Sequence, residues 1–151
     1  MKLINTIIRL QTILLLVFTF LSCDNDDGNA TNETACNYEG FSYLDTNNND
    51  QTLIAEADLQ TQFFPNASNG PFGASGIEIS SYVSSPTLFF ATNTIAVNQT
   101  GTGTLTIDNV DYDVTVTCQR EGNTVGEEVR LDVTYSSIEV EFCVTIDEVV
   151  N

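Results

Sequence analysis

Hydrophobic and polar residues alternate along the last third of the chain. Three segments, 110–118, 129–135 and 138–146, show this period of two. In a strand, such a period places apolar side chains on one face and polar side chains on the other. The pattern therefore predicts three half-buried β-strands in series.

Short polar connections link these segments. Asp108 and Asn109 separate an apolar segment at 103–107 from the strand that begins at Val110. Asp and Asn readily adopt the positive φ of tight hairpins. Similar turns are expected at 121–124 and at Ser136 and Ser137, so the strands should follow one another as an antiparallel meander.

Further strands are expected upstream. The predicted segments are 40–44, 77–83, 88–91 and 94–97, with a loop rich in Pro, Gly, Asn and Ser at 65–76. The segment 55–64 fits a strand or one short helix, because Leu59 and Phe63 suit either period. Residues 36–151 are enough for one hydrophobic core. We predict an all-β domain there, a single antiparallel β-sandwich of about seven or eight strands with immunoglobulin-like architecture.

The first 22 residues differ from the rest. Lys2 and Arg9 precede an apolar run at 13–21, which has the length of the hydrophobic region of a signal peptide. Polar residues interrupt the segment upstream of this run, which makes it short for a membrane-spanning helix. The segment 1–22 is therefore expected to be an export signal.

The residues that follow the run are Phe20, Leu21, Ser22 and Cys23. They resemble the lipobox of bacterial prolipoproteins, with Phe20 in place of the more common Leu. The resemblance implies cleavage before Cys23, a diacylglycerol thioether on its sulfur and acylation of the new amino terminus. Two or three fatty chains would attach the protein to a membrane without a spanning segment. An ordinary secretory signal, with Cys23 in a disulfide, is the alternative.

Residues 23–35 are polar and begin with acidic residues at Asp24, Asp26 and Asp27. Such a segment buries too little apolar surface to fold and is expected to be a tether. The acidic cluster also resembles the surface-export signal of lipoproteins from Bacteroidota. The sorting rule of enteric bacteria would instead keep a protein with Asp24 in the inner membrane. The Asn, Thr and Asp content of the remaining chain, which has no lysine, resembles flavobacterial proteins and favours the outer membrane, with the domain facing the exterior.

Charge limits the expected partners. The chain has 21 acidic residues, four basic residues and no histidine, with a formal net charge of −17. Only Arg120 and Arg130 are basic beyond residue 22. Such a surface repels nucleic acid and anionic headgroups, and it favours solubility, cations or basic partners.

Lipidation of Cys23 would leave Cys36, Cys118 and Cys143 in an oxidising compartment. The strand periods place Cys118 with the apolar face and Cys143 with the opposite, polar face. Two strand spacings would separate these two residues, which is too far for a disulfide. Cys36 is on the flexible entry to the domain, so we predict a Cys36–Cys143 disulfide, with Cys36–Cys118 as the alternative.

One loop resembles a calcium site. Asp45, Asn47, Asn49 and Glu56 occupy positions one, three, five and twelve of an EF-hand loop. Asp50 occupies the position of the usual glycine, and the flanks do not resemble paired helices. Because Asx-rich segments also form ordinary turns, a β-turn without metal is the favoured interpretation and a calcium site the alternative.

The inventory of side chains disfavours most enzymes. Without histidine there is no Ser-His-Asp or Cys-His arrangement, and zinc lacks its usual nitrogen ligand. Pairs of carboxylates on one strand face, Asp111 with Asp113 and Glu139 with Glu141, occur on any solvated strand. Carbohydrate binding usually needs exposed aromatic rings, and the chain has no tryptophan. Tyr112 and Tyr135 share the inward face with valines. Tyr38, Tyr43 and Tyr82 remain available for contact with a sugar.

The sequence thus predicts a surface lipoprotein, anchored by lipid in the outer membrane. Its domain is expected to be a non-enzymatic binding or accessory module for an envelope protein or a glycan, without a cofactor other than the calcium considered above. The alternative is a secreted protein that binds or processes glycans or small ligands.

Overall fold

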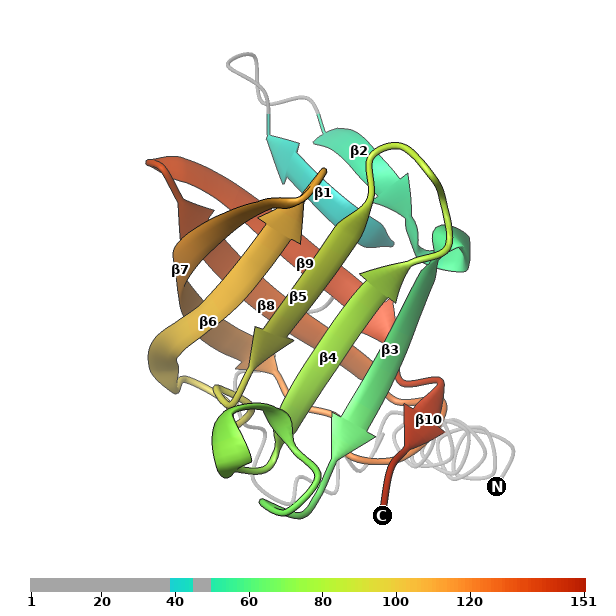
Figure 1. Ribbon diagram of the computed structural model, residues 1–151, viewed down its shortest axis with the longest axis vertical. Coiled ribbons are helices and arrows are strands. Elements are labelled where there is room, and N and C mark those ends of the chain that lie inside the picture. Colours follow the sequence, from blue (N-terminus) through green and yellow to red (C-terminus); the bar gives the residue numbers. More distant parts are fainter. Residues whose placement is uncertain (1–38, 45–49) are drawn as a thin grey trace, which may run out of the picture. The chain divides into compact units, whose positions relative to one another are not determined.

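The computed structural model describes residues 39–44 and 50–151, and this part of the chain is all-β (Figure 1). The strands are β1 (Gly40–Leu44), β2 (Asp50–Ala55), β3 (Leu59–Phe64), β4 (Gly76–Ser81), β5 (Leu88–Thr92), β6 (Thr100–Ile107), β7 (Val110–Arg120), β8 (Glu128–Tyr135), β9 (Ile138–Thr145) and β10 (Glu148–Val149). Two single turns of 3-10 helix interrupt them, η1 (Glu56–Asp58) and η2 (Pro71–Gly73). Among the described residues no helix is long and apolar enough to cross a membrane.

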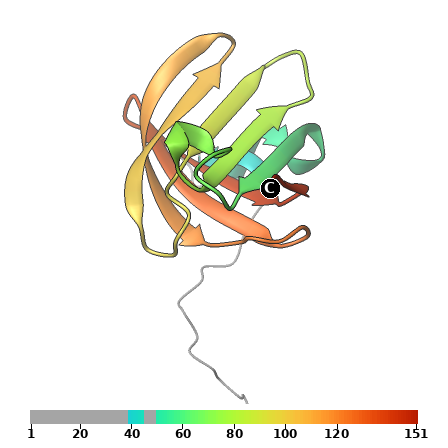
Figure 2. The same cartoon turned by 60° about the horizontal axis from the view of Figure 1, so that its bottom comes forward.

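All ten strands belong to one sheet, in the order β10-β3-β4-β5-β6-β7-β8-β9-β1-β2. Neighbours are antiparallel except β10, which pairs with β3 in parallel. The sheet curls, so that β8 and β9 pass behind β4 and β5 in Figure 1, and Figure 2 shows the two groups of strands as facing walls of the curl. The all-β prediction is confirmed, but the two-sheet sandwich with immunoglobulin-like architecture is not, because one continuous sheet wraps around the core.

The core fills the space enclosed by the curl. Alternate residues of the strands point inward, and most of them are fully buried. At the centre, the Phe142 ring on β9 lies 4.6 Å from the Phe41 ring on β1 and 4.6 Å from the Phe90 ring on β5. Since β5 and β9 are four positions apart in the sheet, this contact joins opposite walls of the curl.

The C-terminal meander follows the prediction closely. The three predicted strands correspond to β7, β8 and β9, and the hairpin residues Asp108 and Asn109 have φ values of 49° and 65°. Ser136 and Ser137 likewise have positive φ, at 46° and 66°. The alternating pattern and two-residue turns therefore fix both the strands and their register.

Several upstream predictions need correction. The predicted strand at 94–97 is a loop, in which the Gln99 side chain accepts hydrogen bonds from the backbone N–H groups of Ile95 and Ala96 at 3.2 Å. Such a side-chain acceptor competes with a strand ladder. The ambiguous segment 55–64 divides into the end of β2, η1 and β3, so both interpretations hold in part. Strands β2 and β10 were not predicted.

The sheet contains two β-bulges, which assist its curl. One lies between Phe41 and Ser42 of β1, opposite an extra residue in β2, and the other lies between Cys118 and Arg120 of β7. The second bulge matters for the surface, because it sets Arg120 directly opposite Arg130 of β8.

The Asp108–Asn109 turn offers a test of the fold. Replacing Asn109 by valine should destabilise the domain by about 1–2 kcal/mol, because a β-branched residue disfavours positive φ. Replacing Asn109 by glycine should leave stability unchanged or raise it slightly. Urea unfolding of the two variants measures this difference, and equal stability of both would contradict the turn geometry.

Candidate functional site

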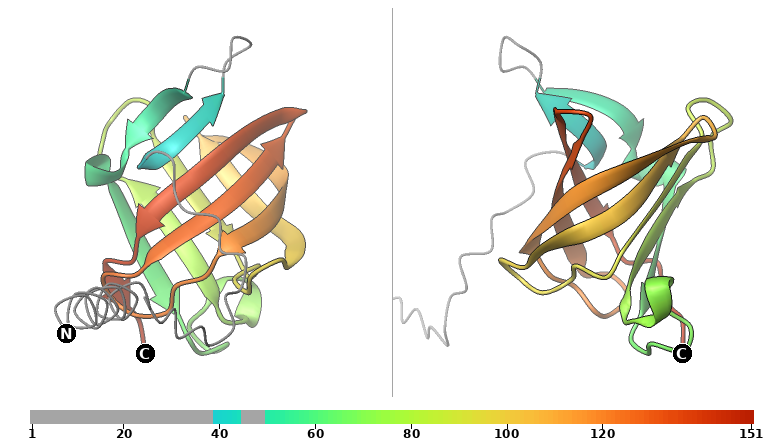
Figure 3. Two further views of the ribbon diagram at one scale, coloured as in Figure 1. Left: turned by 180° about the vertical axis from the view of Figure 1, so that it is seen from behind. Right: turned by 60° about the vertical axis from the view of Figure 1, so that its left-hand side comes forward.

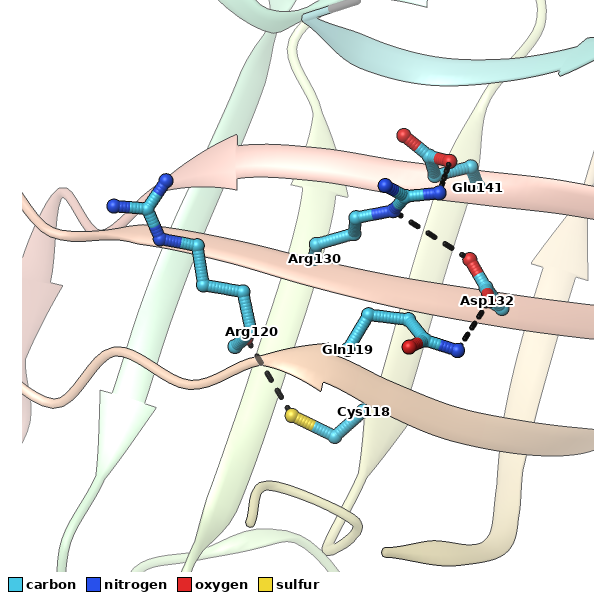
Figure 4. Close-up of polar contacts among 6 residues, drawn as sticks. All are labelled: Cys118, Gln119, Arg120, Arg130, Asp132 and Glu141. Atoms are coloured by element: carbon cyan, nitrogen blue, oxygen red, sulfur yellow. Dashed lines mark hydrogen bonds and ion pairs between the residues drawn. The ribbon is translucent and has the colours of Figure 1, made fainter. Parts of the chain in front are cut away.

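The outer face of β7, β8 and β9 carries the two basic side chains of the described part of the chain, Arg120 and Arg130. They are direct neighbours across β7 and β8. Like charges in this position repel each other, so each guanidinium requires a carboxylate of its own. Figure 4 shows that the two guanidinium groups point in opposite directions along the sheet.

Arg130 lies within a network that crosses three strands (Figure 4). Its Nη2 lies 2.8 Å from Oε2 of Glu141 on β9, and its Nε lies 3.7 Å from Oδ1 of Asp132. Gln119 of β7 donates a hydrogen bond of 2.6 Å to the other oxygen of Asp132. The side chains of Arg130 and Glu141 are only 12% and 10% exposed, so this ion pair lies largely out of water.

Arg120 pairs with Glu128 at the start of β8, in a more exposed position. The adjoining loop is fixed by Glu127, whose Oε2 accepts hydrogen bonds from the backbone N–H of Asn123 at 2.8 Å and of Thr124 at 3.1 Å. These backbone donors lower the pKa of Glu127 below its usual value. The turn between β7 and β8 lies at 124–127, closed by a hydrogen bond of 3.1 Å from the N–H of Glu127 to the carbonyl of Thr124, and not at the predicted 121–124. The Glu127 carboxylate caps the amides at the start of this turn.

An open cleft of about 730 Å³ adjoins the Arg130 network. The pairing of β1 with β9 ends where Ser42 meets Glu141, so the chain beyond Ser42 leaves β9. Tyr43 lines the cleft together with Arg130, Asp132 and Glu141. This volume suits a small ligand. The lining supplies one guanidinium, several carboxylates and a phenol, which are groups for polar recognition.

Three tyrosines gather at the end of the curl next to this cleft. The rings of Tyr112 and Tyr135 lie 5.2 Å apart at an interplanar angle of 59°, and both pack against the core, as does Tyr43. Burial raises the pKa of Tyr135, and the phenols of Tyr112 and Tyr43 raise it further. The inward placement of Tyr112 and Tyr135 is confirmed, whereas Tyr43, expected to be available at the surface, is half-buried.

Most of the predicted calcium ligands lie outside the described residues, namely Asp45, Asn47 and Asn49. The fourth, Glu56, lies in η1, and its Oε1 accepts a hydrogen bond of 2.8 Å from the backbone N–H of Thr145. Glu56 thus joins the end of β9 to the segment between β2 and β3. Calcium binding at these four positions stays a prediction.

The cysteines occupy opposite faces of the sheet, as predicted. Cys118 shares the core with Val114 and Val116, and its sulfur donates a hydrogen bond of 3.5 Å to the carbonyl of Arg120. Cys143 lies on the outer face of β9, but it is buried rather than exposed as its polar neighbours suggested. The predicted lipidation site Cys23 and disulfide partner Cys36 lie outside the described residues.

The network around Arg130 was not predicted, although the strand period and the turn residues contain the information needed to predict it. Alternation places Arg130, Asp132 and Glu141 on the outer faces of two strands joined by the Ser136–Ser137 turn. A two-residue hairpin at Ser136 and Ser137 requires Asp132 to pair with Glu141, and the structure shows this pairing. The register thus predicts one arginine between two carboxylates.

Comparison of the chain with protein-family models, with curated proteins and with solved structures finds no match. Within the described residues, no three His, Cys, Asp or Glu side chains are grouped so that they could hold a metal ion.

Proposed function

We propose that the protein is a lipid-anchored lipoprotein of the outer membrane, exposed at the cell surface, whose β-domain is a non-enzymatic binding or accessory module. The observation that carries the proposal is the leader with Phe20, Leu21, Ser22 and Cys23, followed at once by acidic residues. Lipid on Cys23 would hold the domain at the membrane through the segment 23–35.

The packing of the domain supports a binding role at its outer surface. The aromatic contact of Phe41, Phe90 and Phe142 joins opposite walls of the curled sheet, so core side chains occupy the interior at that level. A partner or ligand would therefore bind at the outer face or at the ends of the sheet. The excess of carboxylates there would favour neutral or cationic partners and disfavour nucleic acid.

A Cys36–Cys143 disulfide is part of this proposal. Gly40 of β1 is paired in register with Cys143 of β9, and Cys36 precedes Gly40 by four residues. A chain of that length spans at most about 14 Å, and Cys143 lies on the strand next to β1, whereas Cys118 lies three strands from β1 and in the core. Cys143 is therefore the partner that we propose. The bond would tie the anchored end of the domain to β9.

Replacing Cys23 by serine tests the anchor. The variant should move from the membrane fraction to the soluble fraction, because serine cannot form the thioether. Intact mass of the unaltered protein should show loss of residues 1–22 and a gain of acyl chains, and protease treatment of intact cells should remove it. Cys36→Ser is the matched control and should remain in the membrane fraction. A Cys23→Ser variant that stays equally membrane-bound would overturn the proposal in favour of the secreted alternative.

A further inference from the structure

A second open groove, of about 650 Å³, lies on the outer face of β6 and β7 next to η2. The polar side chains along it come from cross-strand pairs, Thr102 with Thr115 and Thr104 with Asp113. The inward neighbours Leu105, Val114 and Val116 belong to the core, so the alternation turns these hydroxyls and the carboxylate outward. Asn93, just after β5, adds an amide to the same groove.

Phe72 of η2 borders the groove and is 60% exposed. Its backbone lies in the left-handed region, with φ 56° and ψ 21°, which is unfavourable for a bulky residue. Burial of the ring does not offset this cost, because most of the ring faces solvent. Strained backbone positions cluster at ligand-binding sites, so an exposed aromatic ring at such a position is a candidate ligand contact.

The η2 turn, which carries Phe72, lies at the lower end of the sheet in both views of Figure 3. Packing and hydrogen bonds around this turn restrict its backbone. Pro71 is buried, and a Cβ on Gly76 would come within 2.6 Å of the Pro71 ring and 2.4 Å of the Thr92 carbonyl. Backbone hydrogen bonds from Gly73 to Gly70 and from Ala74 to Pro71, at 3.3 and 3.2 Å, close the turn. The ring is therefore presented on a fixed loop, which reduces the entropy lost on binding.

We propose that this groove binds a neutral oligosaccharide. The Phe72 ring offers an apolar surface for the C–H face of a sugar ring, while Asp113, Asn93 and the threonine hydroxyls offer acceptors and donors for its hydroxyl groups. None of the groove residues is basic, so an anionic ligand has no counter-charge and would meet Asp113. This inference rests on the proposed binding role and names the ligand class for it.

Titration calorimetry with the full chain, purified in a detergent without a sugar headgroup, tests the proposal. The probes are cellohexaose, laminarihexaose, maltohexaose and mannohexaose, with hexagalacturonate as the anionic comparison. At least one neutral hexasaccharide should bind with a dissociation constant on the order of 1 mM or tighter, and hexagalacturonate should not bind. Phe72→Ala should weaken binding about tenfold, which corresponds to about 1.4 kcal/mol, because the variant loses the aromatic contact with the sugar.

Two further variants separate a binding role of Phe72 from a structural one. Phe72→Asn should lose binding while its thermal midpoint stays equal or rises, because Asn tolerates positive φ. Tyr82→Ala removes an aromatic ring that is 68% exposed in the loop between β4 and β5, and it should bind as the unaltered chain does. Lack of binding to all four neutral probes at about 10 mM, or binding unchanged by Phe72→Ala, would overturn the proposal. Membrane attachment through Cys23 is measured separately, so failure of one proposal is distinguishable from failure of the other.

Discussion

Replacing Phe142 by alanine should destabilise the domain by about 3–5 kcal/mol, the range observed for large aromatic truncations in packed cores. Phe142 is fully buried and stacks on Phe41 while it also contacts Phe90. The substitution removes the ring that joins β9 to β5 across the interior, and the curved walls cannot collapse without breaking strand pairs. Urea unfolding, monitored by far-ultraviolet circular dichroism, measures the loss.

Phe89→Ala is the matched control for this experiment. Phe89 is on β5 beside Phe90, but it points outward and is partly exposed. Its truncation should cost about 1 kcal/mol or less, because no cavity forms. If Phe142→Ala cost no more than Phe89→Ala, the described packing of the interior would be wrong.

Replacing Arg130 by alanine should destabilise the domain by about 3 kcal/mol, because it leaves the Glu141 carboxylate in a largely buried position without its guanidinium. The double variant Arg130→Met and Glu141→Leu should recover most of this loss, since apolar side chains of similar volume remove the buried charge altogether. Thermal and urea unfolding of the single and double variants measure both values.

Arg120→Ala provides the comparison, because the Arg120–Glu128 pair is 32% and 44% exposed. Water screens such a pair, so its loss should cost about 1 kcal/mol or less. Equal effects of Arg120→Ala and Arg130→Ala would contradict the difference in burial between the two arginines.

The sequence predicts the meander of β7, β8 and β9 well because two local signals agree there. Alternation assigns the faces, and the turn residues Asp108, Asn109, Ser136 and Ser137 assign the register. The closure of the sheet carries no such local signal. It depends on Gly40 meeting Cys143 and on Gln62 meeting Glu148, contacts between residues far apart in the chain. Periodicity alone therefore does not distinguish one curled sheet from a sandwich.

The outer surface was predicted only in part for a related reason. Periodicity gives the face of Cys143 and Glu141 but not their burial, which depends on what packs over that face. Phe72 gives no signal as an exposed aromatic residue, because its position depends on the conformation of the η2 turn. Asp45, Asn47 and Asn49 remain predictions from spacing alone.

The pairing of β10 with β3 bears on how the chain reaches its folded state. Besides the ladder, Asp147 donates its N–H to the carbonyl of Thr61, and Thr61 donates its own N–H to the Asp147 carboxylate at 2.7 Å. These contacts span 86 residues, and the pairing of β1 with β9 spans even more. Loop closure of that length is slow. The curl can therefore close only after residues near 150 have left the ribosome, so the complete sheet forms after the whole domain has been synthesised.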